Sequence, residues 1–377
     1  MLAVIVTFPT LEKIAIFLLT LSVLVVLHEF GHFLIARRNG VRVTEFAVGM
    51  GPKLFGWTSP RSGTLYSIRA LPIGGYCMMH GEDGKTSTAE QQREFRVSRS
   101  PDPENFQAKS PLARLGIIVA GPVANFILAY VILLLGTIAF GVASSTVQPV
   151  VGMVLPNSPA QAIGLQPGDR ILQIDGTVIR SGDQLIAMIH RALGKRLDLV
   201  FENNGTRREV YVTPKPCDVP QLHGMGCIGF APAAAYRRVG LIHAIASSGR
   251  DYLQIAGQTV GSLGLLFAHF HRYASQVSGP IGIGQVAITV EDFGWGPYLR
   301  LAALISFALG IFNLLPIPAL DGGRAAFIIA ELIRGRPVDP DKEAMVHIAG
   351  FALLMALMVI IAVHDISRIV EGRGVFN

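Results

Sequence analysis

Four long runs of apolar residues dominate the hydrophobic pattern of the chain. They cover residues 14–36, 115–142, 298–317 and 344–363. Each run is close to the ~20 residues that a helix needs to cross a bilayer. The pattern therefore predicts four transmembrane helices, with polar segments of different character between them.

The segment between the first two runs has two parts. Residues 41–76 alternate apolar and polar side chains, and Gly49, Gly51 and a Gly74-Gly75 pair interrupt the alternation. This pattern predicts short strands in a small antiparallel sheet near the end of the first helix. The edge of such a sheet can pair with an extended peptide, although a hairpin packed on the membrane surface fits the pattern equally well. Residues 77–114 are polar and predict a cytoplasmic loop. Together with the first two apolar runs, these segments form an N-terminal membrane part, residues 1–148.

A soluble domain is predicted between the second and third runs. Within residues 149–214, a helix at 181–192 precedes strands at 196–202 and 207–212. Residues 215–297 mix apolar and polar positions at helical spacing, which is typical of an amphipathic region at the membrane interface. Residues 298–377 then form the C-terminal membrane part. The expected fold is a polytopic α-helical membrane protein with a membrane-associated β-hairpin sheet and an inserted α+β domain.

Composition supports a membrane protein. The 377 residues are 51% hydrophobic and 15% charged, with a mean hydropathy of +0.47. Soluble domains carry roughly 25% charged residues. Lys and Arg gather in the loops after the first and third runs, so both loops are expected in the cytoplasm and the inserted domain outside it. The net charge of +6 therefore follows membrane topology and does not indicate nucleic-acid binding.

Two pairs of residues outside the apolar runs carry separate expectations, one about exposure to water and one about a disulfide. His364 and Asp365 follow the fourth run and are expected to face water. Cys217 and Cys227 lie on the side that would be oxidising, where they could form a disulfide. Two unpaired thiols fit the sequence equally well, because three cysteines are too few for a disulfide framework.

Ionisable residues occur inside the first apolar run, where they are costly and indicate a functional site. His28 and His32 are four residues apart and so share one face of a helix. Glu29 is placed to take a proton from a water that a metal activates. This His-Glu-x-x-His spacing is typical of zinc hydrolases. The alternative, three solvated surface residues, conflicts with a position inside a membrane span.

A carboxylate follows the third run. Pro316 and Pro318 break the helix at membrane depth, which is tolerated only where the backbone lines a cavity or is buried in protein. Asp321 comes next, and a catalytic zinc site with two histidines needs a third protein ligand. Asp321 alone would indicate a helix N-cap, but together with the histidine motif it indicates the third ligand. The charge pattern places all three ligands near the cytoplasmic face.

The second run carries Gly121-Pro122 and Asn125 near its start. Small residues let helices approach closely in lipid, and an amide can bond a neighbouring helix. These residues predict a proline-kinked structural helix, and Asn125 is also a candidate for positioning a group in the site.

These motifs together resemble the site-2 protease family of intramembrane zinc metalloproteases. The resemblance rests on the His28-Glu29-x-x-His32 motif and on the segment from Asn313 to Asp321-Gly322-Gly323. With Gly121-Pro122 and one inserted domain, the chain is most similar to the bacterial regulator-of-sigma-E protease branch. Residues 158–176 also resemble the bacterial PDZ pattern, with Ile163 where that pattern has Ala.

The resemblance implies a role for each matching position. His28, His32 and Asp321 would hold one Zn2+ per chain, and Glu29 would be the general base. Asn313 would hold substrate or stabilise the oxyanion. A second set of candidates for substrate handling lies in the predicted sheet: Gly74, Gly75 and Tyr76.

The implied substrate is a single-span membrane protein, an anti-sigma factor, cut within or near its transmembrane segment. The implied location is the bacterial inner membrane, with the PDZ domain in the periplasm as a peptide binder or a steric gate. A non-catalytic PDZ scaffold is the alternative, and it predicts loss of one or more of the four motif residues, all of which are present. A transporter would need paired repeats, and the sequence contains none.

Overall fold

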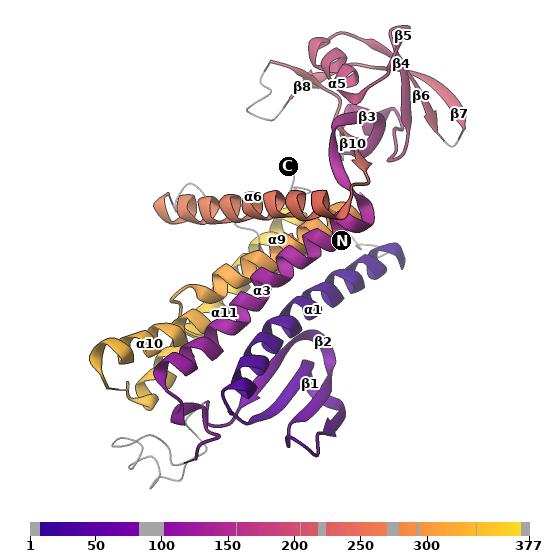
Figure 1. The fold of residues 1–377 in the computed structure, drawn as a ribbon. Coiled ribbons are helices and arrows are strands. Elements are labelled where there is room, and N and C mark those ends of the chain that lie inside the picture. Colours follow the sequence, from indigo (N-terminus) through magenta and orange to yellow (C-terminus); the bar gives the residue numbers. More distant parts are fainter. Residues whose placement is uncertain are drawn as a thin grey trace. The chain divides into compact units, whose positions relative to one another are not determined.

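The fold is taken from a computed structural model (Figure 1). The structure describes residues 8–82, 102–155, 157–203, 205–217, 224–269, 279–291, 294–336 and 338–370. The chain divides into two compact units. The helical unit comprises Met1–Leu133, Ser248–Val290 and Leu299–Asn377, and the sheet unit comprises Leu134–Ser247 and Glu291–Tyr298.

Long helices make up most of the helical unit. Their bounds are α1 Phe8–Arg38, α3 Pro111–Phe140, α6 Leu241–Ala268, α8 Pro280–Glu291, α9 Trp295–Leu314, α10 Asp321–Arg334 and α11 Pro340–Val370, with a 3-10 turn η1 at Phe106–Ala108. Among the described residues, four helices (α1, α3, α9 and α11) are long and apolar enough to cross a membrane. The prediction of four spans is therefore confirmed by length and composition. Helix α9 ends at Leu314, three residues before the expected end, because the prolines beyond it cannot continue the helix.

The helices pack through two buried clusters. In one, Ile255 of α6 contacts Ala129 of α3 together with Ala303 and Phe307 of α9, and α6 accordingly lies across α3 and α9 (Figure 1). The other cluster joins α1, α3 and α10 around Ala36, Ile117 and other buried side chains. This second cluster surrounds the end of α1 that carries the histidine motif.

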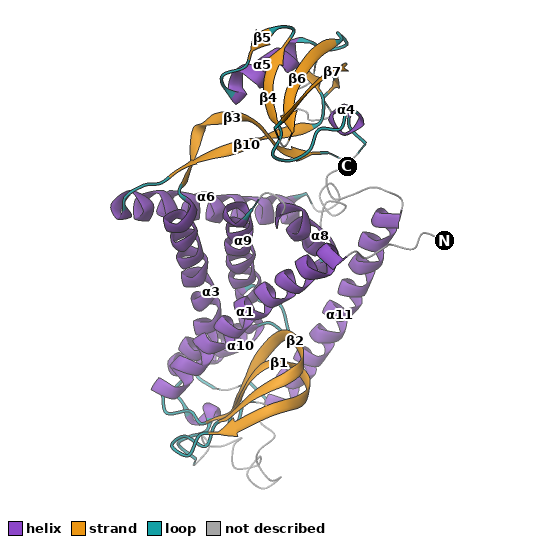
Figure 2. Cartoon of the chain, turned by 90° about the vertical axis from the view of Figure 1, so that its right-hand side faces the viewer, coloured by secondary structure: helices purple, strands orange, loops and turns teal. Residues whose placement is uncertain are grey.

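A two-stranded antiparallel sheet lies beside the C-terminal half of α1 (Figure 2). Its strands are β1 Val43–Thr58 and β2 Leu65–Met79, both longer than the alternation predicts. The extra length arises because each strand folds back, so that residues 43–48 of β1 pair with both 65–68 and 75–79 of β2. Gly49 and Gly51, each at a φ of 84°, provide the left-handed backbone for this fold.

The sheet unit contains a six-stranded sheet in the order β10-β3-β4-β6-β7, with β5 beside β4. The bounds are β3 Val142–Val154, α4 Pro159–Ala162, β4 Arg170–Ile174, β5 Thr177–Val178, α5 Gly182–Arg191, β6 Leu197–Asn203, β7 Thr206–Val212, β8 Lys215–Pro216, β9 Gly226–Cys227 and β10 Phe230–Arg237. The core includes Phe201, Leu199 and Leu185, all fully buried. The predicted helix 181–192 and the two strands after it are confirmed to within one residue.

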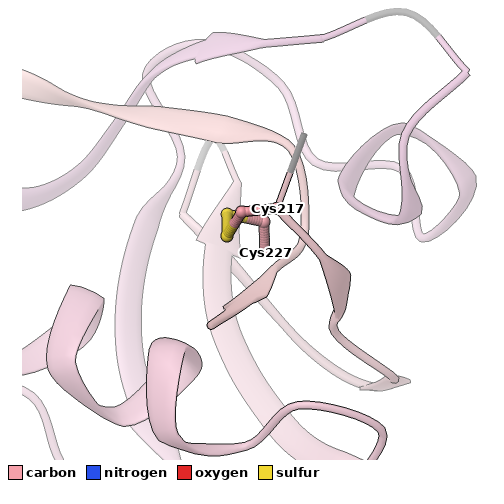
Figure 3. Close-up of a disulfide and its surroundings, with 2 residues drawn as sticks. All are labelled: Cys217 and Cys227. Atoms are coloured by element: carbon pink, nitrogen blue, oxygen red, sulfur yellow. A yellow bond between two sulfur atoms is a disulfide. The ribbon is translucent and has the colours of Figure 1, made fainter. Parts of the chain in front are cut away.

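The predicted domain end at residue 214 is too early. Strand β10 pairs with β3 from Phe230 opposite Val154 to Arg237 opposite Val142, so the sheet continues well into the region expected at the membrane interface. The sequence did not indicate this strand because it is rich in alanine, which strands disfavour. Before it, Cys217 and Cys227 form a disulfide (Figure 3), which settles the alternative that the sequence left open.

The expectation that Asp365 faces water is wrong. Its residue is 4% exposed, and its Oδ2 accepts hydrogen bonds from the N–H groups of Gly279, at 3.0 Å, and Gly282, at 2.9 Å. Helix α11 continues to Val370 and brings this carboxylate to the start of α8. A carboxylate there is favoured, because the first N–H groups of a helix lack partners within it.

Candidate active site

Three donor atoms from two helices converge inside the helical unit. Nε2 of His28 and Nε2 of His32 lie 3.2 Å apart. Oδ2 of Asp321 lies 3.0 Å from the first and 3.3 Å from the second. The histidines are 6% and 5% exposed and sit on one face of α1, while Asp321 begins α10. The structure thus brings together the three residues that the sequence proposes as ligands.

The donor set fits a zinc ion. Among the described residues, Oδ2 of Asp321 is buried without a hydrogen-bond partner. Buried polar atoms are normally satisfied, so an orphaned carboxylate oxygen beside two imidazole nitrogens needs an explanation. Two imidazole nitrogens and one carboxylate oxygen are the protein ligands of a catalytic zinc site with one position left open. A cation at this point would satisfy all three atoms.

Helix α3 orients both imidazole rings. Nδ1 of His32 donates to the carbonyl oxygen of Ile117 at 2.9 Å, which leaves Nε2 with its lone pair. Nδ2 of the Asn125 side-chain amide lies 3.2 Å from Nδ1 of His28. Asn125 is fully buried, and its backbone carbonyl oxygen accepts from the Ser306 hydroxyl at 2.9 Å. Such partners fix the orientation of metal-binding histidines.

Gly121 makes room for the two rings. A Cβ atom at this position would lie 2.2 Å from Nε2 of His32 and 2.8 Å from Cε1 of His28. Gly31 of α1 has a similar role in helix packing, because a Cβ there would lie 2.4 Å from the Ala120 carbonyl oxygen. The sequence indicates close helix packing at Gly121-Pro122, but not that the packing partner is the histidine pair.

Strand β2 provides a hydrogen bond to Glu29. The N–H of Cys77 donates to Oε2 of Glu29 at 3.0 Å, and the Ser22 hydroxyl of α1 donates to the carbonyl oxygen of Gly74 at 3.4 Å. A Cβ at Gly75 would lie 3.3 Å from Val26, so the strand passes close to α1. The sheet therefore holds the carboxylate of Glu29 beside the histidines. Because the donor is a backbone group, the sequence gives no sign of the role of Cys77.

The start of α10 is held by close backbone packing. A Cβ at Gly322 would lie 2.1 Å from the carbonyl oxygen of Leu315, and one at Gly323 would lie 2.5 Å from that of Ile317. Only glycine allows this approach, which brings Asp321 back toward α1. Two ion pairs anchor the helix. Arg114 of α3 donates to both oxygens of Glu331 at 2.6 Å, and Arg324 pairs with Glu82 beyond β2.

Two other candidates are Asn313 and Tyr76. Asn313 is half-buried in the last turn of α9. Tyr76 belongs to a charged group on the sheet, with the guanidinium of Arg69 5.0 Å from its ring. Burial and the neighbouring Glu45 raise the pKa of Tyr76. Burial opposes ionisation of Glu45 too, but hydrogen bonds from Ser67 and Arg69 hold its pKa below the usual value.

Comparison with known proteins identifies clear relatives. The family model of peptidase family M50 matches residues 16–357. A Clostridium acetobutylicum protein, named provisionally as a zinc metalloprotease, is 35% identical and covers 94% of this chain and 97% of its own. The zinc metalloprotease RasP of Shouchella clausii and the regulator of sigma-W protease RasP of Bacillus subtilis are each 31% identical, and each match covers 94% of this chain and 98% of the relative.

Some solved structures match a small part of the chain. The PDZ domain of an SdrC-like protein from Listeria monocytogenes is 23% identical, with 24% of this chain and 93% of that chain covered and a TM-score of 0.21. A solution structure from Geobacillus thermodenitrificans is 34% identical over 20% of this chain and 86% of that chain, with a TM-score of 0.18. The PDZ assignment rests on the sequence pattern of residues 158–176.

Proposed function

The chain belongs to peptidase family M50 and is a zinc metalloprotease, and on this premise we propose that its zinc site is the cluster of His28, His32 and Asp321. The observation that carries the proposal is the convergence of the three donor atoms, which lie 3.0 to 3.3 Å from one another. One zinc ion per chain would account for the orphaned oxygen of Asp321. The reaction is hydrolysis of a peptide bond within or near the transmembrane segment of a substrate.

Glu29 is the proposed general base. When bound, zinc supplies Lewis acidity that polarises a peptide carbonyl and makes water acidic near neutral pH. Glu29 takes the proton from the attacking water and passes it to the leaving amine. The hydrogen bond from Cys77 holds one carboxylate oxygen and leaves the other to accept the proton. His28 and His32 hold their orientation throughout, through Asn125 and Ile117 of α3.

The substrate is proposed to bind along β2. One edge of the β2 segment 75–79 pairs with β1, where Cys77 lies opposite Phe46. The N–H of Cys77 points to Glu29, so the other edge faces the base. An extended peptide added at this edge would regain backbone hydrogen bonds that it loses when a substrate helix unwinds. Gly75 and Tyr76 lie on this segment and Gly74 directly precedes it. Asn313 remains the proposed oxyanion or substrate contact.

The proposed substrate class is a single-span membrane protein, an anti-sigma factor in regulated proteolysis. The name of the Bacillus subtilis relative, a regulator of sigma-W protease, supports this class. The Lys- and Arg-rich loops support an active site near the cytoplasmic face of a bacterial plasma membrane, with the sheet unit on the opposite side. There the disulfide between Cys217 and Cys227 would be stable. The PDZ groove is proposed to take a peptide or to exclude large substrates.

The test is zinc content measured together with cleavage. Wild-type protein, Asp321→Ala and Asp183→Ala are purified in detergent and analysed for bound zinc, and each is incubated with a model single-span substrate. Asp183 is an exposed aspartate of α5 and serves as the matched control. About one zinc per chain and cleavage are expected in the wild type and control, and neither in Asp321→Ala. A zinc-loaded, active Asp321→Ala protein would place the third ligand elsewhere. A wild type without zinc or cleavage would favour the scaffold.

A further inference from the structure

The turn that presents Asp321 contains a strained residue. Residues 315–320 connect α9 to α10, and Ala319, two residues before the carboxylate, has a φ of 75°. A residue with a Cβ atom is disfavoured in this left-handed region, because Cβ approaches its own carbonyl oxygen. Such a conformation persists only where the surrounding structure holds it.

His347 of α11 makes a specific contact with this turn. Its Nδ1 accepts a hydrogen bond from the N–H of Ala319 at 2.8 Å. Its ring lies 5.6 Å from the ring of Phe327 of α10, measured between centroids, and its side chain is 16% exposed. The same imidazole therefore touches the strained turn and the helix that the turn begins.

A second contact one turn further along α11 bears on the same segment. A Cβ at Gly350 would lie 2.3 Å from Cβ of Pro318 and 3.0 Å from its carbonyl carbon. Helix α11 thus supports the turn at two points, by a hydrogen bond to Ala319 and by backbone packing on Pro318. Of these two, only the hydrogen bond depends on the chemistry of a side chain.

We propose that His347 is a positioning residue for Asp321: its hydrogen bond to Ala319 fixes the turn and hence the place of the carboxylate. His347 acts through the turn and is not itself one of the three donor residues. The inference rests on the proposed role of Asp321 as a zinc ligand. Ligand atoms must lie within about 0.2 Å of their ideal distances, so relaxation of the turn weakens zinc binding even though all three ligands remain.

The test separates the hydrogen bond from simple packing. His347→Phe keeps a ring against Phe327 but has no acceptor, whereas His347→Asn loses the ring but keeps an acceptor at the δ position. His347→Ala removes both, and His364→Ala, at an exposed position of the same helix, is the control. Two quantities are measured on the full-length protein: amide exchange at Ala319 without metal, and zinc affinity by competition with a chelator.

Both the exchange rate and the zinc affinity should depend on whether residue 347 offers a hydrogen-bond acceptor to Ala319. His347→Phe and His347→Ala should exchange the Ala319 amide about tenfold faster and bind zinc on the order of tenfold more weakly. His347→Asn and His364→Ala should match the wild type in both. A packing role would reverse the ranking of Phe and Asn, and that result would overturn the proposal.

The outcome also separates this inference from the proposed zinc site. If the wild type binds zinc, Asp321→Ala does not, and His347→Phe behaves as wild type in both measurements, only the role of His347 is wrong. If Asp321→Ala binds zinc as tightly as the wild type, the zinc site itself is wrong.

Discussion

Gly121 of α3 faces His32 of α1 so closely that a Cβ atom on the glycine would lie 2.2 Å from the Nε2 atom of the imidazole. Cβ atoms are not observed at such a distance from another heavy atom. The absence of a side chain at residue 121 therefore allows the observed position of His32, which the hydrogen bond from Nδ1 to Ile117 also fixes. A residue without a side chain is thus part of the environment of the proposed metal.

Gly121→Ala is expected to disrupt the zinc site while leaving the fold in place. The added methyl group displaces the ring of His32 and also meets Cε1 of His28, at 2.8 Å. We expect zinc affinity and cleavage to fall at least 10–100-fold, the range seen when partners of metal ligands are altered. Zinc titration and cleavage of a single-span substrate check this.

Gly116→Ala is the matched control on the same helix. A Cβ there has no neighbour within 4 Å, and alanine is the better helix former by roughly 1 kcal/mol. This variant should bind zinc and cleave as the wild type does. Equal behaviour of the two alanine variants would mean that the rings have room to move, contrary to the structure.

Glu29→Gln is expected to keep zinc and lose cleavage. The glutamine amide oxygen can still accept the hydrogen bond from Cys77, but it cannot take a proton from water. Loss of a general base typically lowers the rate by about 10²–10⁴-fold. Glu12→Gln, an exposed position near the start of α1, is the control. Zinc content and cleavage are measured together, and normal cleavage by Glu29→Gln would remove the base assignment.

The proposed zinc ligands could be predicted from the sequence because the prediction depends on the spacing of a few residues. His28 and His32 are four positions apart, which places them on one helical face. Pro316 and Pro318 predict that the helix ends before Asp321. Span length likewise predicts four membrane helices, since a bilayer has a fixed thickness.

The surroundings of the cluster could not be predicted, because they involve groups without a sequence signature. Ile117 and Cys77 contribute backbone atoms, and any residue type supplies the same carbonyl or N–H group. Asp365 looked like a solvated residue past a helix, since nothing local shows that α8 begins beside it. Such contacts depend on how segments distant in the sequence pack together. No local sequence pattern predicts that packing.

Asn125→Leu is expected to weaken zinc binding through His28. In the structure Nδ2 of the Asn125 amide faces Nδ1 of His28. With a metal on Nε2, Nδ1 carries the proton and needs an acceptor, which the amide supplies when it turns by about 180° and presents its oxygen. Leucine has a similar volume and no acceptor, so zinc affinity should fall about 10–100-fold. Asn125→Asp restores an acceptor and should retain binding. Chelator competition measures both, and tight zinc binding by Asn125→Leu would exclude this role.

The ion pair between Glu82 and Arg324 is expected to couple the base to the third ligand. Arg324 lies in the first turn of α10, three residues after Asp321. The second carboxylate oxygen of Glu82 accepts from the N–H of Met79 at 3.2 Å, at the end of the strand that also binds Glu29. Reversing either charge alone therefore separates β2 from α10.

We expect Glu82→Arg and Arg324→Glu each to reduce cleavage about tenfold or more, and the double reversal to recover much of that loss. Groups in direct contact show coupling of roughly 0.5–3 kcal/mol in such cycles. Glu104→Gln is the control, because its ion pair with Arg42 is long, at 3.7 Å, and largely exposed, so it should contribute little. Cleavage rates of all four variants are compared at saturating zinc. Strictly additive losses in the double variant would show that the two charges act independently, and the sheet and α10 would then be positioned by packing alone.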